Sequence, residues 1–226
     1  MPSLQNNSQA DDPVQQNHAA LIWPELTRFP SFNPPLRLGV MASGQGSNFE
    51  ALVESTRTGP LDGTIELLVV NNPQCGARKR AERLGIPCIA HDHRLQSNRE
   101  ALDQQLVNSF RQADVEAIVM AGWMRIVTPV LINAFKNRLI NIHPSLLPSF
   151  RGVNAVEQAL NAGVTLAGCS VHLVVPEVDA GRILAQAAVP VLSSDDPVSL
   201  KARIQVQEHR LLPLAVAVGA RDWRRH

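Results

Sequence analysis

Residues 139–148 read Leu-Ile-Asn-Ile-His-Pro-Ser-Leu-Leu-Pro and place two polar side chains at the end of an apolar run. Residues two apart on a strand point to the same face, so Asn141 and His143 would leave a strand end side by side. The amide of Asn141 can donate a hydrogen bond, and the imidazole of His143 can move a proton near neutral pH. A donor beside a proton shuttle is the minimum equipment for attack on a carbonyl, although a lone histidine is as often structural.

A catalytic histidine needs a partner that orients it, usually a carboxylate or a carbonyl group. Asp179, within the sequence Pro-Glu-Val-Asp-Ala-Gly at residues 176–181, is the candidate. A carboxylate beside a protonated histidine raises the histidine pKa and so tunes it as an acid–base group. An aspartate in such a segment can equally cap a turn, and the sequence alone leaves both interpretations open.

A glycine turn at residues 44–48, Gly-Gln-Gly-Ser-Asn, follows the first predicted strand and opens a helix. Glycines let the backbone approach an anion, and the free N–H groups at a helix start bind it. Phe49 stands where a dinucleotide fingerprint has its third glycine, and no Gly-Lys-Ser/Thr follows. The pattern therefore favours one small phosphate group over a pyrophosphate, with an ordinary tight turn as the alternative.

Two further motifs are weaker by themselves. The sequence Ala-Gly-Trp-Met-Arg-Ile at residues 121–126 could present backbone groups to a flat heterocycle, or could be a packed hydrophobic corner. Gln205, Glu208 and His209 share one helix face at spacing i, i+3 and i+4, either as a solvated face or as a patch for hydroxyls or an amine. Arg99 lies early in a helix, where the helix dipole disfavours a cation, which hints at another role.

The elements that must position these residues alternate along the chain. Strands are predicted at residues 36–41, 65–70, 87–90, 115–121, 139–143, 171–175 and 183–191, and helices at 47–56, 77–84, 98–113, 129–135, 156–162 and 197–212. Ser97 and Glu100 have the spacing of a capping box for the third helix. Apolar strands alternating with helices predict an α/β domain with a mostly parallel sheet, which binds ligands at the carboxyl ends of its strands. Each motif above follows a predicted strand or lies on the last helix.

Composition limits the classes of function. The chain has 226 residues, 45% of them hydrophobic, which suits one domain with a sizeable core. A net charge of +1 gives no electrostatic case for nucleic acid or membrane as partner, and no apolar run approaches the roughly 20 residues of a membrane-spanning helix. Three scattered cysteines without a Cys-x-x-Cys pair argue against disulfides and zinc and for a reducing compartment. We expect a cytoplasmic enzyme that acts on small molecules.

Three segments are expected along the chain. Residues 1–35 lack a periodic apolar pattern and are predicted to be a flexible N-terminal extension, in which the apolar patch at residues 20–23 could dock. Residues 36–217 would form the catalytic domain, and residues 218–226 a basic C-terminal tail.

Together these motifs resemble those of the phosphoribosylglycinamide formyltransferases, the folate-dependent enzymes of purine synthesis. The resemblance covers about residues 36–217 and rests on five motifs in order: residues 43–48, 121–126, 141–148, 177–181 and 205–209. It implies the formyltransferase fold, a single domain whose Rossmann-like central sheet is flanked by helices. It also implies that a formyl group passes from 10-formyltetrahydrofolate, a cosubstrate, to the amine of 5′-phosphoribosylglycinamide, with no metal, in a monomer or weak homodimer.

The resemblance also implies roles for individual residues. The catalytic set would be Asn141, His143 and Asp179, with Asp179 raising the pKa of His143. The phosphoribosylglycinamide site would comprise Gly46, Ser47, Asn48, Gln205, Val206, Gln207 and Glu208. The folate site would comprise Arg99, Met124, Arg125, Ile126, Val127, Asn141, Val175, Pro176, Glu177, Val178 and Asp179. Asn154 departs from the pattern, because many members have histidine there, which leaves the role of that position open.

Four other classes of protein are alternatives to a phosphoribosylglycinamide formyltransferase. A formyltetrahydrofolate deformylase usually carries an N-terminal regulatory domain, for which about 35 residues are too few. A methionyl-tRNA formyltransferase has a second, basic domain, of which a net charge of +1 gives no sign. A non-catalytic nucleotide-binding module would have no use for Asn141, His143 and Asp179 together. A dinucleotide-dependent oxidoreductase would need the complete glycine fingerprint.

Overall fold

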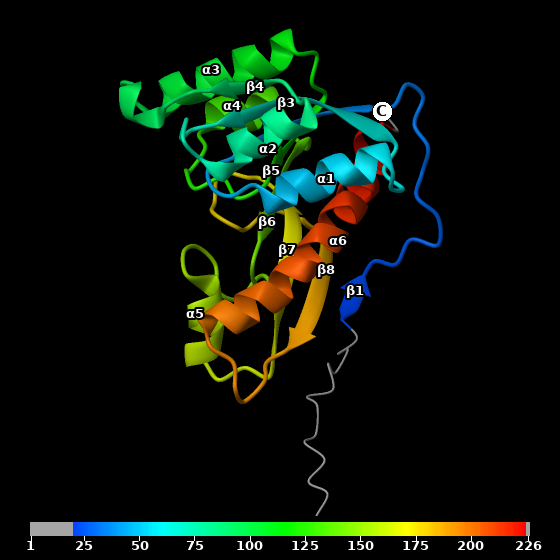
Figure 1. Ribbon diagram of the computed structural model, residues 1–226, viewed down its shortest axis with the longest axis vertical. Helices are drawn as coiled ribbons and strands as arrows, with labels where there is room; N and C mark the ends of the chain where they lie inside the picture. The colour runs from blue at the N-terminus through cyan, green and yellow to red at the C-terminus, as the bar shows by residue number, and fades with distance from the viewer. Residues whose placement is uncertain (1–19, 225–226) are drawn as a thin grey trace, which may run out of the picture.

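The apolar runs of the sequence form one eight-stranded sheet with helices on both faces (Figure 1). The computed structural model describes residues 20–224. The strands are β1 Leu21–Trp23, β2 Leu36–Ala42, β3 Gly63–Val70, β4 Cys88–Ala90, β5 Ala117–Met120, β6 Leu139–His143, β7 Leu166–Leu173 and β8 Ile183–Pro190. The helices are α1 Ser47–Arg57, α2 Gly76–Leu84, α3 Arg99–Gln112, α4 Pro129–Ala134, α5 Ala155–Asn161 and α6 Pro197–Trp223, with a short 3₁₀ helix, η1, at His93–Leu95.

The strand order is β1-β8-β7-β6-β5-β2-β3-β4. Strands β4, β3, β2, β5 and β6 pair in parallel, whereas β7, β8 and β1 are added by antiparallel pairing. The predicted single α/β domain with a mostly parallel central sheet is therefore confirmed. The chain order reverses between β2 and β5, and the carboxyl ends of β2, β5 and β6 lie together at one edge, where such sheets bind ligands.

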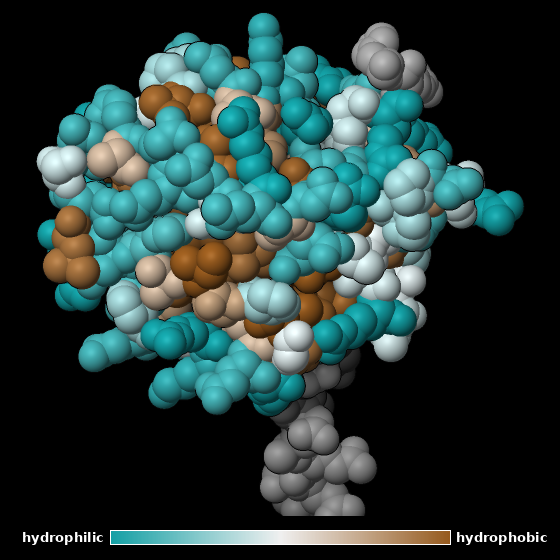
Figure 2. Space-filling model, turned by 90° about the horizontal axis from the view of Figure 1, so that it is seen from above, coloured by the Kyte–Doolittle hydropathy of each residue, from teal (hydrophilic) through white to brown (hydrophobic). Residues whose placement is uncertain are grey.

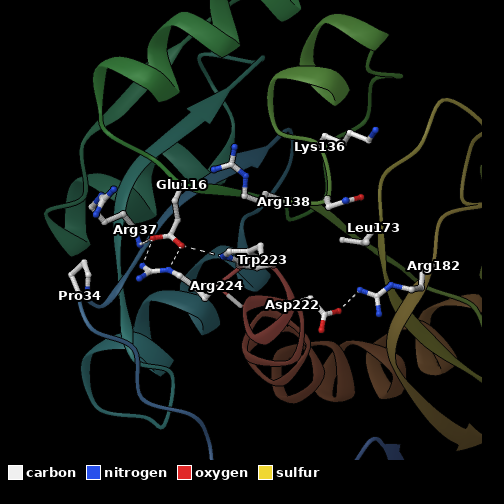
Figure 3. A pocket seen from close by; sticks show the side chains of 11 residues that line it. Pro34, Arg37, Glu116, Lys136, Arg138, Leu173, Arg182, Asp222, Trp223 and Arg224 are labelled. Carbon is white, nitrogen blue, oxygen red and sulfur yellow. Dashed lines mark hydrogen bonds and ion pairs between the residues drawn. The ribbon is translucent and has the colours of Figure 1, made fainter. Parts of the chain in front are cut away.

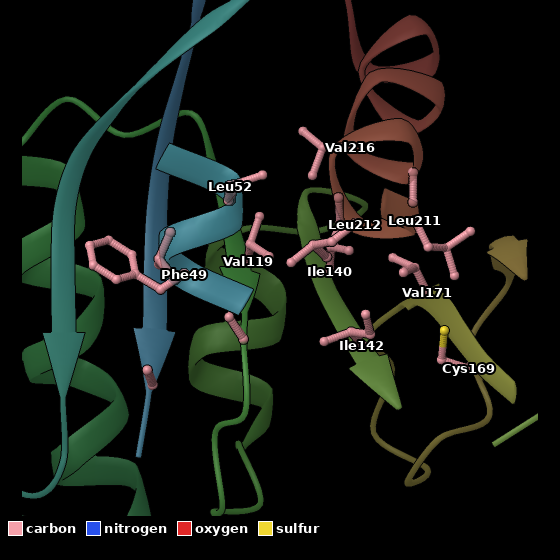
Figure 4. Close-up of a cluster of buried hydrophobic side chains, with 14 of the residues drawn as sticks. Phe49, Leu52, Val119, Ile140, Ile142, Cys169, Val171, Leu211, Leu212 and Val216 are labelled. Atoms are coloured by element: carbon pink, nitrogen blue, oxygen red, sulfur yellow. The ribbon is translucent and has the colours of Figure 1, made fainter. Parts of the chain in front are cut away.

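Two hydrophobic layers hold the helices to the sheet. On one face, Phe49 and Leu52 of α1 and Leu212 of α6 pack against strand residues such as Val119 and Ile140 (Figure 4). On the other face, α3 and α4 pack against a second cluster that includes Leu139. Because side chains alternate along a strand, Ile140 and Ile142 face the first layer, so Asn141 and His143 face the second. The predicted common face of the two polar side chains is thus observed.

Helix ends differ from the prediction in two places. The N-cap of α3 is Asn98, whose side chain accepts a hydrogen bond from the Ala101 amide at 2.8 Å, so the capping box expected at Ser97 is wrong. Helix α6 does not end near Leu212 but continues through Pro213 to Trp223. Proline removes one backbone hydrogen bond, yet the fully buried side chains on both sides of Pro213 stabilise the continued helix.

The folded body extends beyond the expected boundaries at both ends. Strand β1 pairs with β8, Phe29 and Phe32 pack against the first hydrophobic layer, and the Phe32 amide donates to Asp62 Oδ2 at 2.7 Å. Residues 20–35 therefore do not form the predicted flexible extension, because their apolar side chains pack against the folded domain. At the other end, Trp223 and Arg224 bind Glu116, so residues 218–224 differ from a solvated tail. Residues 1–19 and 225–226 of these two segments lie outside the described part of the chain.

The surface is mostly hydrophilic. Figure 2 shows one face on which apolar side chains gather in the middle, within a polar surround. Within residues 20–224, none of the helices is long and apolar enough to cross a membrane.

Candidate active site

Three candidate catalytic side chains meet at the end of β6. His143 is buried, with its Nδ1 3.4 Å from Asp179 Oδ2 and its Nε2 2.8 Å from the Phe150 carbonyl oxygen. Both ring nitrogens therefore face acceptors, so a doubly protonated ring can donate to both. Asn141 lies two residues earlier on the same face of the strand. The sequence predicted Asp179 as the partner of His143, 36 positions away, and the structure places the two side chains 3.4 Å apart.

Asp179 is held as a carboxylate. Its side chain is only 9% exposed, and the Gly152 amide donates to its Oδ2 at 2.9 Å. Burial by itself raises the pKa of Asp179, but hydrogen bonds from His172 and Gly152 and the charge of a protonated His143 outweigh it and hold the pKa below its usual value. The Asp179 backbone is left-handed, with φ of 52°, an uncommon conformation that surrounding contacts must maintain.

A second histidine, His172, completes the cluster and was missed by the sequence analysis. Its Nε2 lies 3.2 Å from Asn141 Nδ2 and 3.5 Å from Asp179 Oδ1, while its Nδ1 lies 2.9 Å from the Leu173 carbonyl oxygen. The antiparallel register of β6 and β7 sets His172 opposite Asn141. A histidine inside an apolar run was the available signal, but strand register depends on distant partners and cannot be read locally.

These side chains border a cavity of about 460 Å³, within the size range of small-molecule sites. It is lined by most of the predicted folate residues, namely Met124, Arg125, Ile126, Val127, Asn141, Val175, Pro176, Glu177, Val178 and Asp179. Arg99 is not among the lining residues. Gly122 and Trp123 of the 121–126 motif also line the cavity, as expected for a turn that faces a heterocycle. The wall further includes residues 152–157, His172 and Lys201, to which the sequence motifs gave no role. Asn154 is thus part of the wall, with its backbone left-handed at φ 57°.

The glycine turn meets the polar face of α6. Gln205 Nε2 donates to Ser47 Oγ at 2.9 Å, and Asn48 Nδ2 donates to Glu208 Oε2 at 2.8 Å. Gly46 has φ of 79°, and a Cβ there would come within 2.6 Å of the Ala77 Cα, so only glycine fits this turn. The structure therefore brings together four residues predicted from two motifs that lie about 160 positions apart in the chain.

Val206 and Gln207 do not join this hydrogen-bonded group. The Val206 side chain is 57% exposed, and the Gln207 side chain accepts from Arg210 at 3.2 Å. Helical geometry explains this, because positions i+1 and i+2 point away from the face that carries Gln205 and Glu208.

Buried polar groups in this region lack protein partners. Burial raises the pKa of Glu208, against the opposing effects of the Asn48 hydrogen bond and the Lys201 charge. Within the described residues, Asn48 Oδ1 and His209 Nε2 are buried without a hydrogen-bond partner. Native proteins rarely leave such groups unpaired, so the turn and the α6 face have the character of a polar binding site.

Two backbone contacts join the glycine turn to the cavity. The Ser43 amide donates to the Gly122 carbonyl at 3.1 Å, and the Met124 amide donates to Ser43 Oγ at 2.9 Å. Lys201 stands one turn before Gln205 on α6 and lines the cavity. The catalytic cluster lines the cavity, and the glycine turn lies beside it. Within residues 20–224, no group of three His, Cys, Asp or Glu side chains is placed to hold a metal ion.

Comparison with known proteins gives consistent relatives. The family model described as "Formyl transferase" matches residues 36–216. The phosphoribosylglycinamide formyltransferase of Bacillus subtilis is 39% identical over 80% of this chain and 92% of its own. A crystal structure of glycinamide ribonucleotide transformylase 1 from Symbiobacterium toebii superposes with a TM-score of 0.80 at 39% identity, covering 81% of this chain and 86% of its own. The human trifunctional purine biosynthetic protein adenosine-3 is 38% identical over 92% of this chain, which spans only 21% of that protein's length.

Proposed function

The chain belongs to the formyl transferase family, and from that premise we propose that it transfers a formyl group from 10-formyltetrahydrofolate to the amine of 5′-phosphoribosylglycinamide. The products are formylglycinamide ribonucleotide and tetrahydrofolate, a step in de novo synthesis of the purine nucleotide IMP. The observation that carries the proposal is the meeting of Asn141, His143 and Asp179 beside a cavity that lies next to a glycine turn. The cavity suits the formyl donor, the glycine turn suits a phosphate, and the catalytic cluster suits carbonyl chemistry.

The reaction begins with attack of the substrate amine on the formyl carbon. Negative charge develops on the formyl oxygen of the tetrahedral intermediate, and donors that are already in place stabilise it. Asn141 supplies an amide N–H, and a protonated His143 supplies the Nε2–H, which exchanges the Phe150 carbonyl for the formyl oxygen when substrate binds. The attacking nitrogen then loses a proton and the folate nitrogen gains one as the C–N bond to folate breaks, and His143 carries the proton between them.

Asp179 supports His143 in this cycle. The ion pair across 3.4 Å orients the imidazole and offsets its positive charge while the ring holds the proton. His172 contacts both Asn141 and Asp179, so it orients the amide and the carboxylate from the far side. The proposal needs no covalent enzyme intermediate.

The ribonucleotide is anchored at the start of α1. Backbone N–H groups of Gly46, Ser47 and Asn48, together with the helix dipole, favour an anionic phosphate there. Gln205 and Glu208 supply acceptors and donors for the sugar and the glycinamide end. Lys201 adds a cation on the same face of α6, at the border of the cavity.

The formyl donor occupies the cavity beside the catalytic cluster. The segments at residues 124–127 and 175–178 both form part of its wall and are suited to hold a flat heterocycle. Arg99 lies at the first position of α3, and its role in folate binding stays a prediction.

The decisive experiment is an assay of the purified protein with 10-formyltetrahydrofolate in the presence and absence of phosphoribosylglycinamide. Tetrahydrofolate that forms only with the amine, together with formylated product, supports transfer. Equal tetrahydrofolate without the amine indicates a deformylase instead. Formylation of methionyl-tRNA in a parallel reaction would point to the tRNA-directed rival.

A further inference from the structure

A second cavity, of about 660 Å³, lies at the opposite edge of the sheet (Figure 3). Arg37 lies at the start of β2, Arg138 directly precedes β6, and Arg182 directly precedes β8. The last turn of α6 closes the cavity with Asp222, Trp223 and Arg224. None of the residues that line this cavity lines the catalytic one, so the two are separate sites.

The wall of this second cavity is strongly basic. Its charged side chains are five cations, Arg37, Lys136, Arg138, Arg182 and Arg224, and two anions, Glu116 and Asp222. The surplus is three positive charges. A concave surface with a surplus of one sign of charge concentrates counter-ions, so this cavity favours an anion over a neutral ligand.

The two carboxylates are already paired. Glu116 accepts from Arg224 at 2.5 Å and from the Trp223 indole N–H at 3.1 Å, and Asp222 accepts from Arg182 at 2.5 Å. These ion pairs fix the positions of two guanidinium groups without consuming the remaining cations of the wall. Arg37 is bound to Asp114, whose side chain is 84% exposed and lies outside the cavity lining.

Arg138 and Lys136 remain without a carboxylate partner among residues 20–224. They flank Asn137, whose left-handed backbone at φ 60° makes the turn between α4 and β6. Arg138 is half-buried and its guanidinium group stands 5.9 Å over the Phe135 ring, which restrains it. A restrained, unpaired guanidinium group in a basic cavity is suited to bidentate binding of a phosphate.

We propose that this second cavity is a binding site for a small molecule with two or more linked phosphate groups. A single phosphate would fill only a small part of the volume and meet only part of the surplus charge, whereas a polyphosphate can reach Arg138 and Lys136 together with the fixed arginines. The Trp223 indole and Leu173 add apolar wall for an organic group on such a ligand. The site does not depend on the formyl transfer proposed for the other edge of the sheet.

Isothermal titration of the full chain with ATP, inorganic tripolyphosphate and adenosine tests the proposal, all without magnesium. Phosphoribosylglycinamide is kept saturating, so that the glycine turn is occupied. Saturable binding of tripolyphosphate, with adenosine inactive, is expected. Tighter binding of ATP than of tripolyphosphate would show that the cavity also holds the nucleoside, and equal binding that it recognises the phosphates alone.

Variants locate the binding. The double variant Lys136→Gln and Arg138→Gln should weaken polyphosphate binding about tenfold or more, because it removes two charged donors. The matched control, Lys79→Gln and Arg111→Gln, removes the same charge from exposed positions on α2 and α3 and should change binding less than about twofold. Absence of binding in the unaltered protein, or equal weakening by both double variants, would overturn the site. Failure of formyl transfer in the assay above would leave this result unaffected.

Discussion

At the residue scale, the site depends on acceptors placed around one imidazole. His143 contacts the Phe150 carbonyl and Asp179, and Asp179 in turn contacts His172 and the Gly152 amide. These contacts come from three segments of chain, which carry Phe150 and Gly152, His172, and Asp179. A side chain held on all sides in this way loses little entropy when substrate arrives, which favours catalysis by preorganised groups.

Removing the proton shuttle or its partner should lower turnover far more than stability. We expect His143→Ala and Asp179→Asn each to reduce kcat by about 10²-fold or more, because general acid–base catalysis contributes that much. Steady-state assays with thermal melts of the same samples measure both effects. His91→Ala is the control, since His91 is half-buried and bonded to Ser109 outside the cavity. Near-normal formyl transfer in both site variants would refute the assignment.

Glu208 should make stability depend on pH. Burial raises its pKa above the ordinary value of 4.5, so the folded protein holds this proton more tightly than the unfolded chain. Its contribution to stability is therefore fully present below 4.5 and is lost as the pH rises toward the folded pKa. Glu208→Gln keeps a neutral acceptor for Asn48 and should become more stable relative to the unaltered protein as the pH rises from about 4.5 to 8.

Melting temperatures across that range measure the effect. Glu54→Gln, which removes a carboxylate from an exposed position on α1, is the control. A pH-independent difference between Glu208→Gln and the unaltered protein would mean that burial does not raise the pKa of Glu208.

At the element scale, the turn between β2 and α1 determines where the phosphate-binding N–H groups point. Gly46 is the N-cap of α1, and its left-handed backbone lets the chain pass close to Ala77 of α2. At the end of α2, Gly85 also has a positive φ, of 65°, but a Cβ added there would meet open space. An alanine at Gly85 would therefore introduce backbone strain alone, whereas an alanine at Gly46 would add a steric clash.

Gly46→Ala should destabilise the protein more than Gly85→Ala. A left-handed alanine costs about 1 kcal/mol at either position, and at Gly46 the added Cβ also collides with backbone, for a total of about 3 kcal/mol. Denaturant unfolding measures both variants. The Gly46 variant should also raise KM for phosphoribosylglycinamide, whereas the Gly85 variant should not. Equal loss of stability in the two variants would show that Ala77 moves aside without cost.

At the scale of the whole molecule, residues 20–35 and 218–224, at the two ends of the described part of the chain, are part of the folded body. The segment at residues 20–35 runs along the sheet edge, where β1 pairs with β8, and then packs two phenylalanines on the core before β2 begins (Figure 1). The end of α6 is tied through Glu116 to the start of β5, a central strand of the sheet. Ties of this kind make segments of low predicted order contribute to overall stability.

Shortening the side chains of the N-terminal segment tests that contribution. Phe32→Ala should lower the free energy of unfolding by about 2 kcal/mol, since a half-buried phenylalanine loses part of the cost of a core truncation. Leu21→Ala, at a side chain that is 68% exposed, should change it by less than about 0.5 kcal/mol. Denaturant melts compare the two. No loss of unfolding free energy in the Phe32 variant would indicate that this segment is only loosely attached to the folded domain.

The strands that carry the site, the glycine turn, and the common face of Asn141 and His143 could be predicted from the amino-acid sequence alone. These features follow from local physics: side-chain alternation along a strand, the backbone freedom of glycine, and the spacing of apolar residues. The formyl transferase family could also be inferred, because its five motifs stand in order along the chain. Residues 124–127 line the observed cavity for the same reason, since they follow β5, whose carboxyl end lies beside that of the parallel strand β6. Residues 175–179 follow the antiparallel strand β7, so only the path of the loop between β7 and β8 brings them to the cavity.

The contacts between side chains, in contrast, depend on the tertiary structure. The 3.4 Å approach of His143 to Asp179, the place of His172 beside Asn141, and the meeting of Asn48 with Glu208 all depend on strand register and helix packing between distant segments. The same long-range packing carries α6 through Pro213 and docks β1 at the sheet edge, against local expectation. Local preference amounts to about 1–3 kcal/mol at any one residue, and burial of a whole apolar face exceeds it.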